Sequence, residues 1–468
     1  MYLLVLALAS ASAFAAFGGR LVTNDDEILI LTRQLDRQSH GTKGWMPELS
    51  PAEHARRAEV YLANRAFADA RAHYQAIITG WPTNSLVPQA LWGTGYSFYQ
   101  ERRYAEAQPL FYRLGREFAA QKEGREGFYY IAPTLLRMGQ PANAAAQYLE
   151  YGHRFPDGER VENAYLNAID CYREAGQRGE AIRWIDFTRE HFSGGATDIN
   201  ALFAQMRLDV AGSDWFSAAS VADELNAMVF TPTVQTTKDE VAYLRAYSLE
   251  QAKQIALAAG TYSSISNRVM SYYGTLATER LRGLGGTNKF LADARAARVR
   301  KDIADTPASY PAPFRDEILR AINGRAVDAR LVLAIMLQES HFNPRARSPA
   351  AARGLLQLTM DMAADFGAAA LQTNVTEEAL YSPAVNIPIG VECLASLTRL
   401  FPDCPEAVVA SYNAGEDNVA RWLARANQRE PGVFTAEIGF QESKQYVCKV
   451  MACYRAYQEL YTADLQRR

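Results

Sequence analysis

A repeat with a period of 37 residues restricts the fold more than any other feature of this sequence. Small residues recur at this spacing, and four residues after each of them stands an aromatic or apolar residue. The recurring residues are Ala70, Ala107, Ala144, Ala181 and Ala218. Each unit holds two helical patterns joined by a short turn, and such units cannot bury their apolar faces alone. The repeat therefore predicts a superhelix of stacked helical pairs over residues 48–232.

The aromatic residues at fixed positions of the repeat have two interpretations. They line a groove that binds a ligand, or they fill the space between neighbouring helical pairs. Their helical spacing favours core packing. The units resemble tetratricopeptide repeats with a slightly longer loop.

The chain after the repeats divides into two further segments. Residues 233–305 keep a helical pattern but lose the register of the repeat. Prolines then interrupt the sequence at Pro307, Pro311 and Pro313, as is typical of a domain boundary. We therefore predict a helical linker region over 233–305 and a separate C-terminal domain over 306–468. We also expect a chain that begins near residue 300 to fold by itself.

Residues 1–17 form an apolar stretch without a charged side chain. Ala11, Ala13 and Ala15 supply the small-residue sites that precede signal cleavage. We expect a cleaved export signal, with an uncleaved membrane anchor and a buried helix as the alternatives. Either of the first two places the remaining chain outside the cytoplasm, in the periplasm or cell envelope.

Charge and motif content exclude several classes of protein. Lys plus Arg total 49 and Asp plus Glu total 52, and the net charge of −3 excludes a basic protein held on nucleic acid by bulk charge. Five cysteines are too few for a disulfide scaffold. Neither an H-E-x-x-H nor a C-x-x-C motif is present, so we expect no metal site and no cofactor.

The cysteines of the C-terminal domain are Cys393, Cys404, Cys448 and Cys453. Cys448 and Cys453 share a predicted helix at i, i+5, where their Cα atoms would lie about 8 to 9 Å apart, too far for a disulfide. Any disulfide must therefore join Cys393 or Cys404 to one of these two. Cys171, in the repeats, is expected to stay free. The alternative is that all five are reduced core residues.

One carboxylate lies on the apolar stripe of a strongly hydrophobic helix predicted over residues 329–340. Asp328 is placed to cap this helix, and Val332, Ile335, Met336 and Glu339 follow i, i+3, i+4, i+7 spacing. Burial would raise the pKa of Glu339, and a carboxyl that stays protonated near neutral pH is what a general acid requires. The alternative is that Glu339 marks the helix end and faces solvent.

Several short motifs follow in a fixed order. They are Glu339-Ser340, Phe342-x-Pro344, Ser348-Pro349, Gly354-Leu355-Leu356-Gln357, Asn386-Ile387, Ser411-Tyr412-Asn413-Ala414-Gly415 and Phe440-x-Glu442-Ser443-Lys444 before Tyr446-Val447. Together they resemble the catalytic domain of the soluble lytic transglycosylases, which is similar to goose-type lysozyme in fold. The resemblance implies an all-α protein in which a helical-repeat superhelix precedes a lysozyme-like catalytic domain.

The resemblance also implies roles for individual residues. Glu339 would be the sole catalytic acid and base, and Tyr412 would steady its carboxyl by a hydrogen bond. Lys444 stands where the family has an arginine, which keeps the charge but loses the bidentate fork. Contacts to the substrate would come from Ser348, Leu355, Leu356, Gln357, Tyr412, Asn413 and Glu442.

The implied substrate is the β-1,4 bond between N-acetylmuramic acid and N-acetylglucosamine in peptidoglycan, cleaved without water to leave 1,6-anhydromuramyl ends. A hydrolytic muramidase of the same fold and cleavage of chitin or chitosan are alternatives. A third is an inactive scaffold of the cell envelope whose repeats bind a protein partner. Glu339 and Tyr412 together argue against an inactive cleft.

Overall fold

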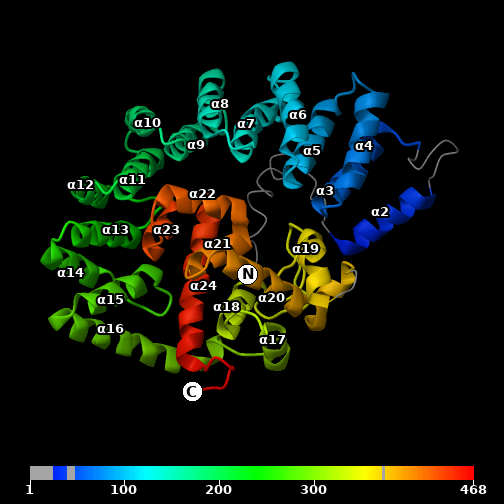
Figure 1. Cartoon of the computed structure of the whole chain (residues 1–468). Coiled ribbons are helices and arrows are strands. Elements are labelled where there is room, and N and C mark those ends of the chain that lie inside the picture. The colour runs from blue at the N-terminus through cyan, green and yellow to red at the C-terminus, as the bar shows by residue number, and fades with distance from the viewer. Residues whose placement is uncertain (1–24, 39–47, 372–374) are drawn as a thin grey trace. The chain divides into compact units, whose positions relative to one another are not determined.

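The computed structural model describes residues 25–38, 48–371 and 375–468. These residues form α-helices and two short 3-10 helices, and outside the helices they make only isolated β-bridges (Figure 1). The all-α fold class is therefore confirmed. The apolar segment 1–17 lies outside the described residues, and no helix within them is long and apolar enough to cross a membrane.

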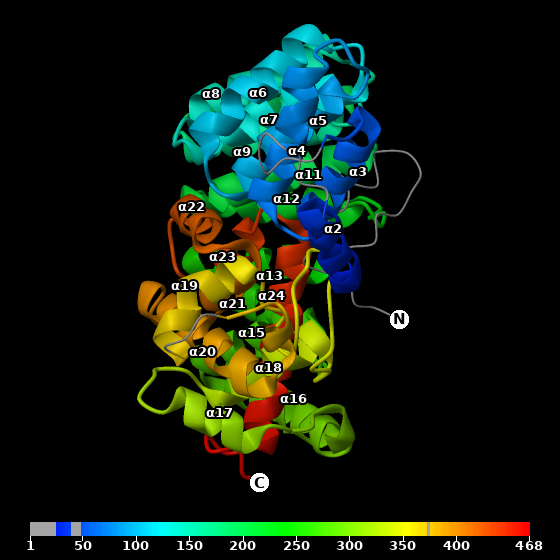
Figure 2. The ribbon, with the colours of Figure 1, turned by 90° about the vertical axis from the view of Figure 1, so that its right-hand side faces the viewer.

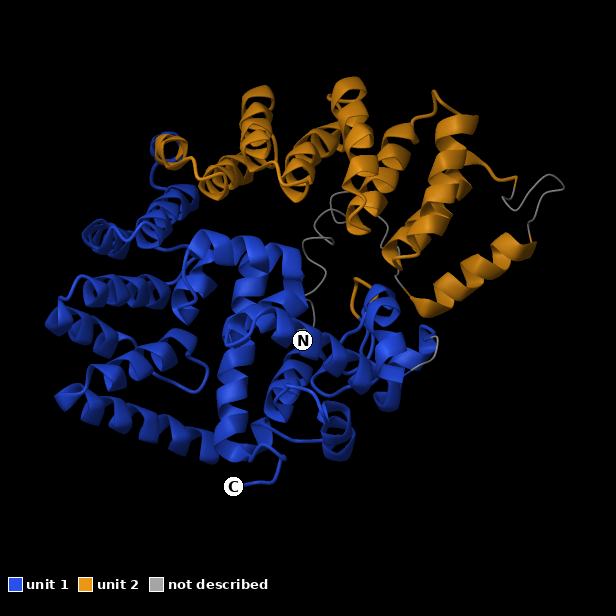
Figure 3. Ribbon diagram, in the orientation of Figure 1, with its two compact units in different colours: residues 1–5, 185–347, 352–468 blue, residues 6–184, 348–351 orange. Residues whose placement is uncertain are grey.

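The described residues divide into two compact units (Figure 3). Unit 1 comprises residues 185–347 and 352–468, and unit 2 comprises the described residues up to 184 together with 348–351. The division falls inside helix α10 (Arg178–His191). It differs from the segment ends expected at 232 and 305, because the last helical pairs pack into one unit with the C-terminal part of the chain.

Unit 2 is a series of helices that pack against their neighbours in chain order. They are α2 (Asp26–Gln38), α3 (Pro51–Ala63), α4 (Phe67–Gly80), α5 (Val87–Gln100), α6 (Tyr104–Glu117), α7 (Lys122–Arg137), α8 (Pro141–Arg154) and α9 (Val161–Glu174), followed by the first half of α10. The recurring Ala70 and Ala144 lie in the second helix of a pair and are buried, as are Tyr74 and Tyr148 four residues later. These residues therefore fill the core between helices, as the core-packing interpretation predicts.

Unit 1 begins with helices that each pack against the next one in the chain: α11 (Ala196–Ala211), α12 (Trp215–Ala227), α13 (Lys238–Gln251), α14 (Ile255–Ser264), α15 (Tyr272–Leu284) and α16 (Gly286–Ala304). Then follow η1 (Pro307–Ser309), α17 (Arg315–Ile322), α18 (Ala329–Ser340), α19 (Met360–Leu371), η2 (Glu378–Tyr381), α20 (Pro383–Leu400), α21 (Pro405–Ala414), α22 (Glu416–Ala426), α23 (Pro431–Glu437) and α24 (Gln441–Leu460). Helix α18 packs against α17 and α24 (Figures 1 and 2).

Within unit 1, helices α11 to α16 share apolar cores with the helices that follow residue 306. Val433 and Ala436 of α23 belong to the same buried cluster as Tyr243 of α13 and Tyr273 of α15. Ile303 of α16 belongs to the cluster formed by the C-terminal helices. The chain therefore continues as one packed body through residue 306, although prolines punctuate the sequence there.

All five cysteines lie in the described residues, and all are free thiols. Burial raises the pKa of Cys393 and Cys448 to about 12 and that of Cys404 and Cys453 to about 11. Thiolates are the reactive form, so we expect these four to alkylate at least ~100-fold more slowly than free cysteine at pH 7.5. Intact mass after brief treatment with iodoacetamide should show none of them labelled, and unfolding should expose all four. Rapid labelling of any of the four in the folded chain would contradict this.

Candidate active site

Glu339 occupies the last turn of α18 and is only 5% exposed. The helix starts where the Asp328 side chain accepts a hydrogen bond from the Arg330 N–H at 2.8 Å. It ends where His341 adopts a left-handed φ of 50° ahead of Pro344. Val332, about two turns earlier, is buried on the same stripe. Glu339 therefore faces the interior, as its helical spacing predicts, and the solvent-facing alternative is wrong.

Burial sets the protonation of this carboxyl. Removal from water disfavours the charged form and raises the pKa of Glu339 to about 8. The Tyr446 hydroxyl of α24 donates a hydrogen bond to Glu339 Oε1 at 2.6 Å, which lowers the pKa in the opposite direction but does not outweigh burial. Glu339 is therefore protonated at neutral pH and has a donor ready for its ionised form.

Tyr446 is a functional residue that the motifs do not assign a role. The expected hydrogen bond from Tyr412 to Glu339 is wrong. The Tyr412 hydroxyl of α21 donates to the Leu356 carbonyl at 2.7 Å instead, and a phenol has only one proton to give. The available signal for Tyr446 was its place directly after the last family motif.

A tightly bonded loop passes beside the end of α18. The Ser340 hydroxyl donates to the Leu355 carbonyl at 2.8 Å, which ties the loop to the residue next to Glu339. Asn386 of α20 accepts from the Leu356 N–H at 2.9 Å. Its amide also donates to the backbone carbonyls of Arg353 and Leu380. The buried Asn386 therefore fixes this loop from both sides.

Two more loop residues are fixed by the backbone. Gly354 has a φ of +76°, and a Cβ there would lie 2.3 Å from the Leu380 carbonyl oxygen, so only glycine fits. The Gln357 side-chain amide donates to the carbonyls of Ala346 and Gly354 at 3.1 and 2.8 Å. The Gln357 side chain and the backbone of Leu355 and Leu356 thus form their hydrogen bonds within the protein, and these bonds fix the conformation of the loop.

Unsatisfied polar atoms gather where α21 ends and α24 begins. The Ser443 hydroxyl donates to Asn413 Oδ1 at 2.6 Å. The Asn413 amide nitrogen and Glu442 Oε1 are buried and have no hydrogen-bond partner among the described residues. Partial burial also raises the pKa of Glu442 to about 7. Buried polar atoms without partners are uncommon in folded proteins, and these two are free to bind a polar ligand.

The remaining predicted residue, Ser348, belongs to unit 2, where its hydroxyl accepts a hydrogen bond from the Ala350 N–H at 3.2 Å. In unit 1 the structure connects the other predicted residues through shared contacts. Ser340, Leu355, Leu356 and Tyr412 form one bonded group beside Glu339, and Asn413 joins Ser443 of the Glu442 segment. Among the described residues, no group of three or more His, Cys, Asp or Glu side chains has metal-binding geometry.

Comparison with known proteins identifies this part of the chain. Residues 316–434 match the family described as Transglycosylase SLT domain. Over these residues the chain is similar to an SLT domain. The resemblance to the lytic transglycosylases, drawn from the motifs, is thereby confirmed.

Curated relatives match about a third of the chain. The chain is 34% identical over 158 residues to a putative soluble lytic murein transglycosylase of Haemophilus influenzae, over 33% of this chain and 26% of the relative. It is 31% identical over 157 residues to the soluble lytic murein transglycosylase of Escherichia coli K12, over 33% and 24%. The matches thus span about a quarter of the length of these relatives.

One solved structure extends the similarity over most of the chain. The structure of a 70-kDa soluble lytic transglycosylase in complex with bulgecin A aligns with a TM-score of 0.50 and 16% identity. The alignment covers 94% of this chain and 76% of the other. At this identity the likeness shows the all-α fold alone.

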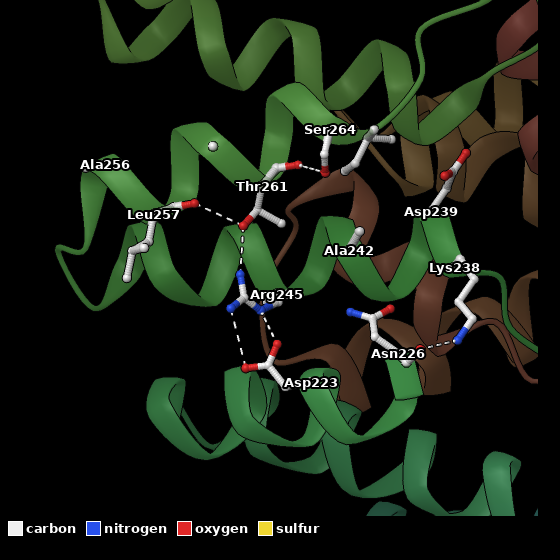
Figure 4. A pocket seen from close by; sticks show the side chains of 12 residues that line it. Asp223, Asn226, Lys238, Asp239, Ala242, Arg245, Ala256, Leu257, Thr261 and Ser264 are labelled. Carbon is white, nitrogen blue, oxygen red and sulfur yellow. Dashed lines mark hydrogen bonds and ion pairs between the residues drawn. The ribbon is translucent and has the colours of Figure 1, made fainter. Parts of the chain in front are cut away.

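A surface pocket of about 540 Å³ lies outside the SLT domain, among α12, α13 and α14 (Figure 4). Its charged groups are used within the protein. Arg245 donates to Asp223 at 2.7 Å and to Thr261 at 2.8 Å. Lys238 donates to the backbone carbonyls at the end of α12. The polar side chains that line the pocket therefore hold the three helices together by hydrogen bonds and ion pairs.

Proposed function

We propose that the chain is a peptidoglycan lytic transglycosylase that cleaves the β-1,4 bond between N-acetylmuramic acid and N-acetylglucosamine. The observation that carries this proposal is Glu339, a buried and protonated acid with Tyr446 as a ready donor, within the residues that match an SLT domain. Glycosidases usually flank the scissile bond with two carboxylates. Among the described residues, no hydrogen bond joins Glu339 to a second carboxylate. Glu392 of α20 is ion-paired with Arg325 at 2.6 Å.

The mechanism follows from one carboxyl acting twice. Protonated Glu339 donates its proton to the glycosidic oxygen, and the bond from that oxygen to the anomeric carbon of the muramyl sugar breaks. The N-acetyl group of the muramyl sugar stabilises the cationic centre. Ionised Glu339, steadied by Tyr446, then takes the proton of the same sugar's 6-hydroxyl, whose oxygen attacks the anomeric carbon. No water is consumed, and the product is a 1,6-anhydromuramyl end.

The unpartnered atoms of Asn413 and Glu442 supply contacts for the substrate. Both are buried polar groups next to Ser443, so a bound glycan or its stem peptide satisfies them. We also infer that the protein works in the periplasm or cell envelope, where its substrate lies. The apolar segment 1–17 would export the chain or attach it to the membrane, and the helical repeats remain available to a protein partner.

Product analysis tests the proposed function against its alternatives. Purified sacculi are digested with the full chain, and the soluble products are analysed by mass spectrometry. Anhydro ends, lighter by one water molecule than reducing ends, are the expected result. Reducing ends would identify a hydrolytic muramidase, and the absence of products from sacculi would favour the scaffold. Products from chitin or chitosan alone would indicate the other substrate class.

Tyr446→Phe is expected to move the pH dependence of cleavage. The hydroxyl favours the ionised carboxylate, so its removal raises the pKa of Glu339 above about 8. Because the acid must be protonated, activity falls as pH rises through that pKa. The alkaline limb should therefore shift upward by about 0.5 to 1 pH unit, the effect of one lost hydrogen bond. A limb that stays in place or moves to lower pH in kcat–pH profiles would contradict this role.

A further inference from the structure

Lys444 is a buried cation that contacts three other segments of unit 1: helix α11, helix α13 and the loop before α13. Its side chain lies on α24, which follows the SLT-matching residues 316–434 in the chain, and the residue is only 6% exposed. The ammonium donates to Glu240 of α13 at 3.0 Å and to the Gln235 carbonyl at 3.4 Å. It also lies 5.1 Å from the centre of the Phe203 ring of α11. Lys444 therefore faces the helical pairs and is not available to a stem peptide.

Glu240 is held as firmly as its partner. Its carboxylate accepts hydrogen bonds from the Thr236 hydroxyl at 2.7 Å and from the Tyr273 hydroxyl of α15 at 3.0 Å. Only 1% of its side chain is exposed. A buried carboxylate with three donors and a buried ammonium with two oxygen acceptors form an ion pair whose polar atoms are satisfied. The pair therefore has one preferred geometry.

The ion pair and the catalytic contacts occupy different faces of the same helix. Ser443 and Tyr446, at i, i+3, point to Asn413 and Glu339. Lys444 and Tyr446 are separated by about 200° around the axis, so they lie on opposite sides of α24. The first two turns of α24 are thus held between α13 on one side and the candidate active site on the other.

Such an ion pair adds little to stability compared with apolar residues of similar size, because desolvation offsets the attraction. Its geometry is specific, however, and it fixes one place along α24. We propose that Glu240 and Lys444 are positioning residues, whose ion pair holds the first two turns of α24 so that Tyr446 meets the Glu339 carboxyl. This inference rests on the proposed function, since it concerns the acid of that reaction. The helical pairs thereby set the geometry of an active site on another segment of the chain.

A shift in the Glu339 pKa separates this role from a purely structural one. The titratable side chains that face Glu339 are Tyr446 of α24 and Tyr412 of α21, and burial keeps both phenols neutral. The Tyr446 hydrogen bond favours the ionised form of Glu339. Loosening α24 weakens this bond. The pKa of Glu339 then rises, and the alkaline limb of activity moves to higher pH. A general loss of stability would leave that limb where it is.

The test uses the full chain with substitutions at the ion pair. Lys444→Met, and the double substitution Glu240→Gln with Lys444→Met, are expected to lower kcat by about 10-fold, part of the 10²–10⁴-fold that a general acid supplies. Both should move the alkaline limb upward by about half a pH unit, in the direction of Tyr446→Phe. Lys444→Arg keeps the charge and should restore the wild-type limb and kcat to within about threefold. The double variant leaves no unpaired buried charge, so it carries the test if the single variant fails to fold.

A matched control removes a different contact of the same helix α13. The Tyr247 hydroxyl donates to Gln428 at 2.6 Å, between α13 and the loop before α23, and does not touch α24. Tyr247→Phe should lower the Tm without moving the pH limb. The inference is overturned if the folded double variant keeps the wild-type kcat and limb, if Tyr247→Phe shifts the limb equally, or if Lys444→Arg behaves like Lys444→Met. If the wild-type chain releases no product from glycans, the proposed function fails before this comparison begins.

Discussion

Replacement of Glu339 by glutamine is expected to lower cleavage of peptidoglycan by at least ~100-fold, because general acid–base help is worth 10²–10⁴-fold and this carboxyl supplies both steps. The amide has nearly the same volume but can neither give a proton to the glycosidic oxygen nor take one back. In the part of the chain that the structure describes, Tyr446 is the side chain hydrogen-bonded to Glu339, and no carboxyl is bonded to it. Release of soluble products from sacculi, measured over a range of enzyme concentrations, checks the result.

Folding of the Glu339→Gln variant supplies the control. The pKa of Glu339 rises from 4.5 to about 8 on folding, so burial destabilises the chain increasingly as pH rises from about 4.5 towards 8. Glutamine lacks this penalty, so the Tm of the variant should equal or exceed that of the wild type, with a larger gain at pH 8 than at pH 5. A turnover loss of less than about tenfold in a folded variant would remove Glu339 from the mechanism.

Local periodicity explains why Glu339 and the repeat could be predicted from the sequence. The spacing of Val332, Met336 and Glu339 lies within one helix, so the residues that define the buried face are close in the chain. The same holds for Ala70 and Tyr74, one turn apart in α4. Helix geometry is then sufficient to predict from this spacing which side chains are buried.

The contacts that orient the acid could not be predicted in the same way. Tyr446 lies 107 residues after Glu339, and Lys444 lies 204 residues after Glu240. No periodic pattern links segments at such distances, so only the packed structure brings them together. Tyr412 shows the same limit. Its motif was identified, but its hydroxyl proton goes to the Leu356 carbonyl, whose position depends on Asn386.

The boundary at residue 306 is a second place where local features do not decide the structure. Prolines at 307, 311 and 313 punctuate the chain. However, Arg207 of α11 pairs with the buried Glu437 at 3.1 Å, and Tyr272 of α15 bonds to Thr435 at 2.9 Å. Prolines interrupt helices but do not determine which helices share a core.

A chain beginning at residue 306 is therefore expected to lose its cooperative fold, whereas one beginning at Arg178 should keep it. The shorter chain lacks α16, whose Ile303 lies in the C-terminal core, and it exposes Val433, Ala436 and Met451, which pack with α13 and α15. Each buried apolar side chain contributes about 1.5 to 3 kcal/mol, and a domain has a net stability of only about 5 to 15 kcal/mol. Loss of several such contacts removes most of that margin.

Thermal unfolding followed by near-ultraviolet circular dichroism compares the two chains. The chain from Arg178 should unfold in one sharp transition and cleave soluble glycan fragments. The chain from residue 306 should show no cooperative transition and at least ~100-fold less cleavage, since it also lacks Glu240 and the fixed geometry of α24. If the shorter chain unfolds cooperatively and cleaves like the longer one, the helical pairs neither stabilise nor position the SLT domain. In that case the Pro-punctuated segment is the true boundary, and the contacts of Lys444, Glu437 and Thr435 are incidental to the active site.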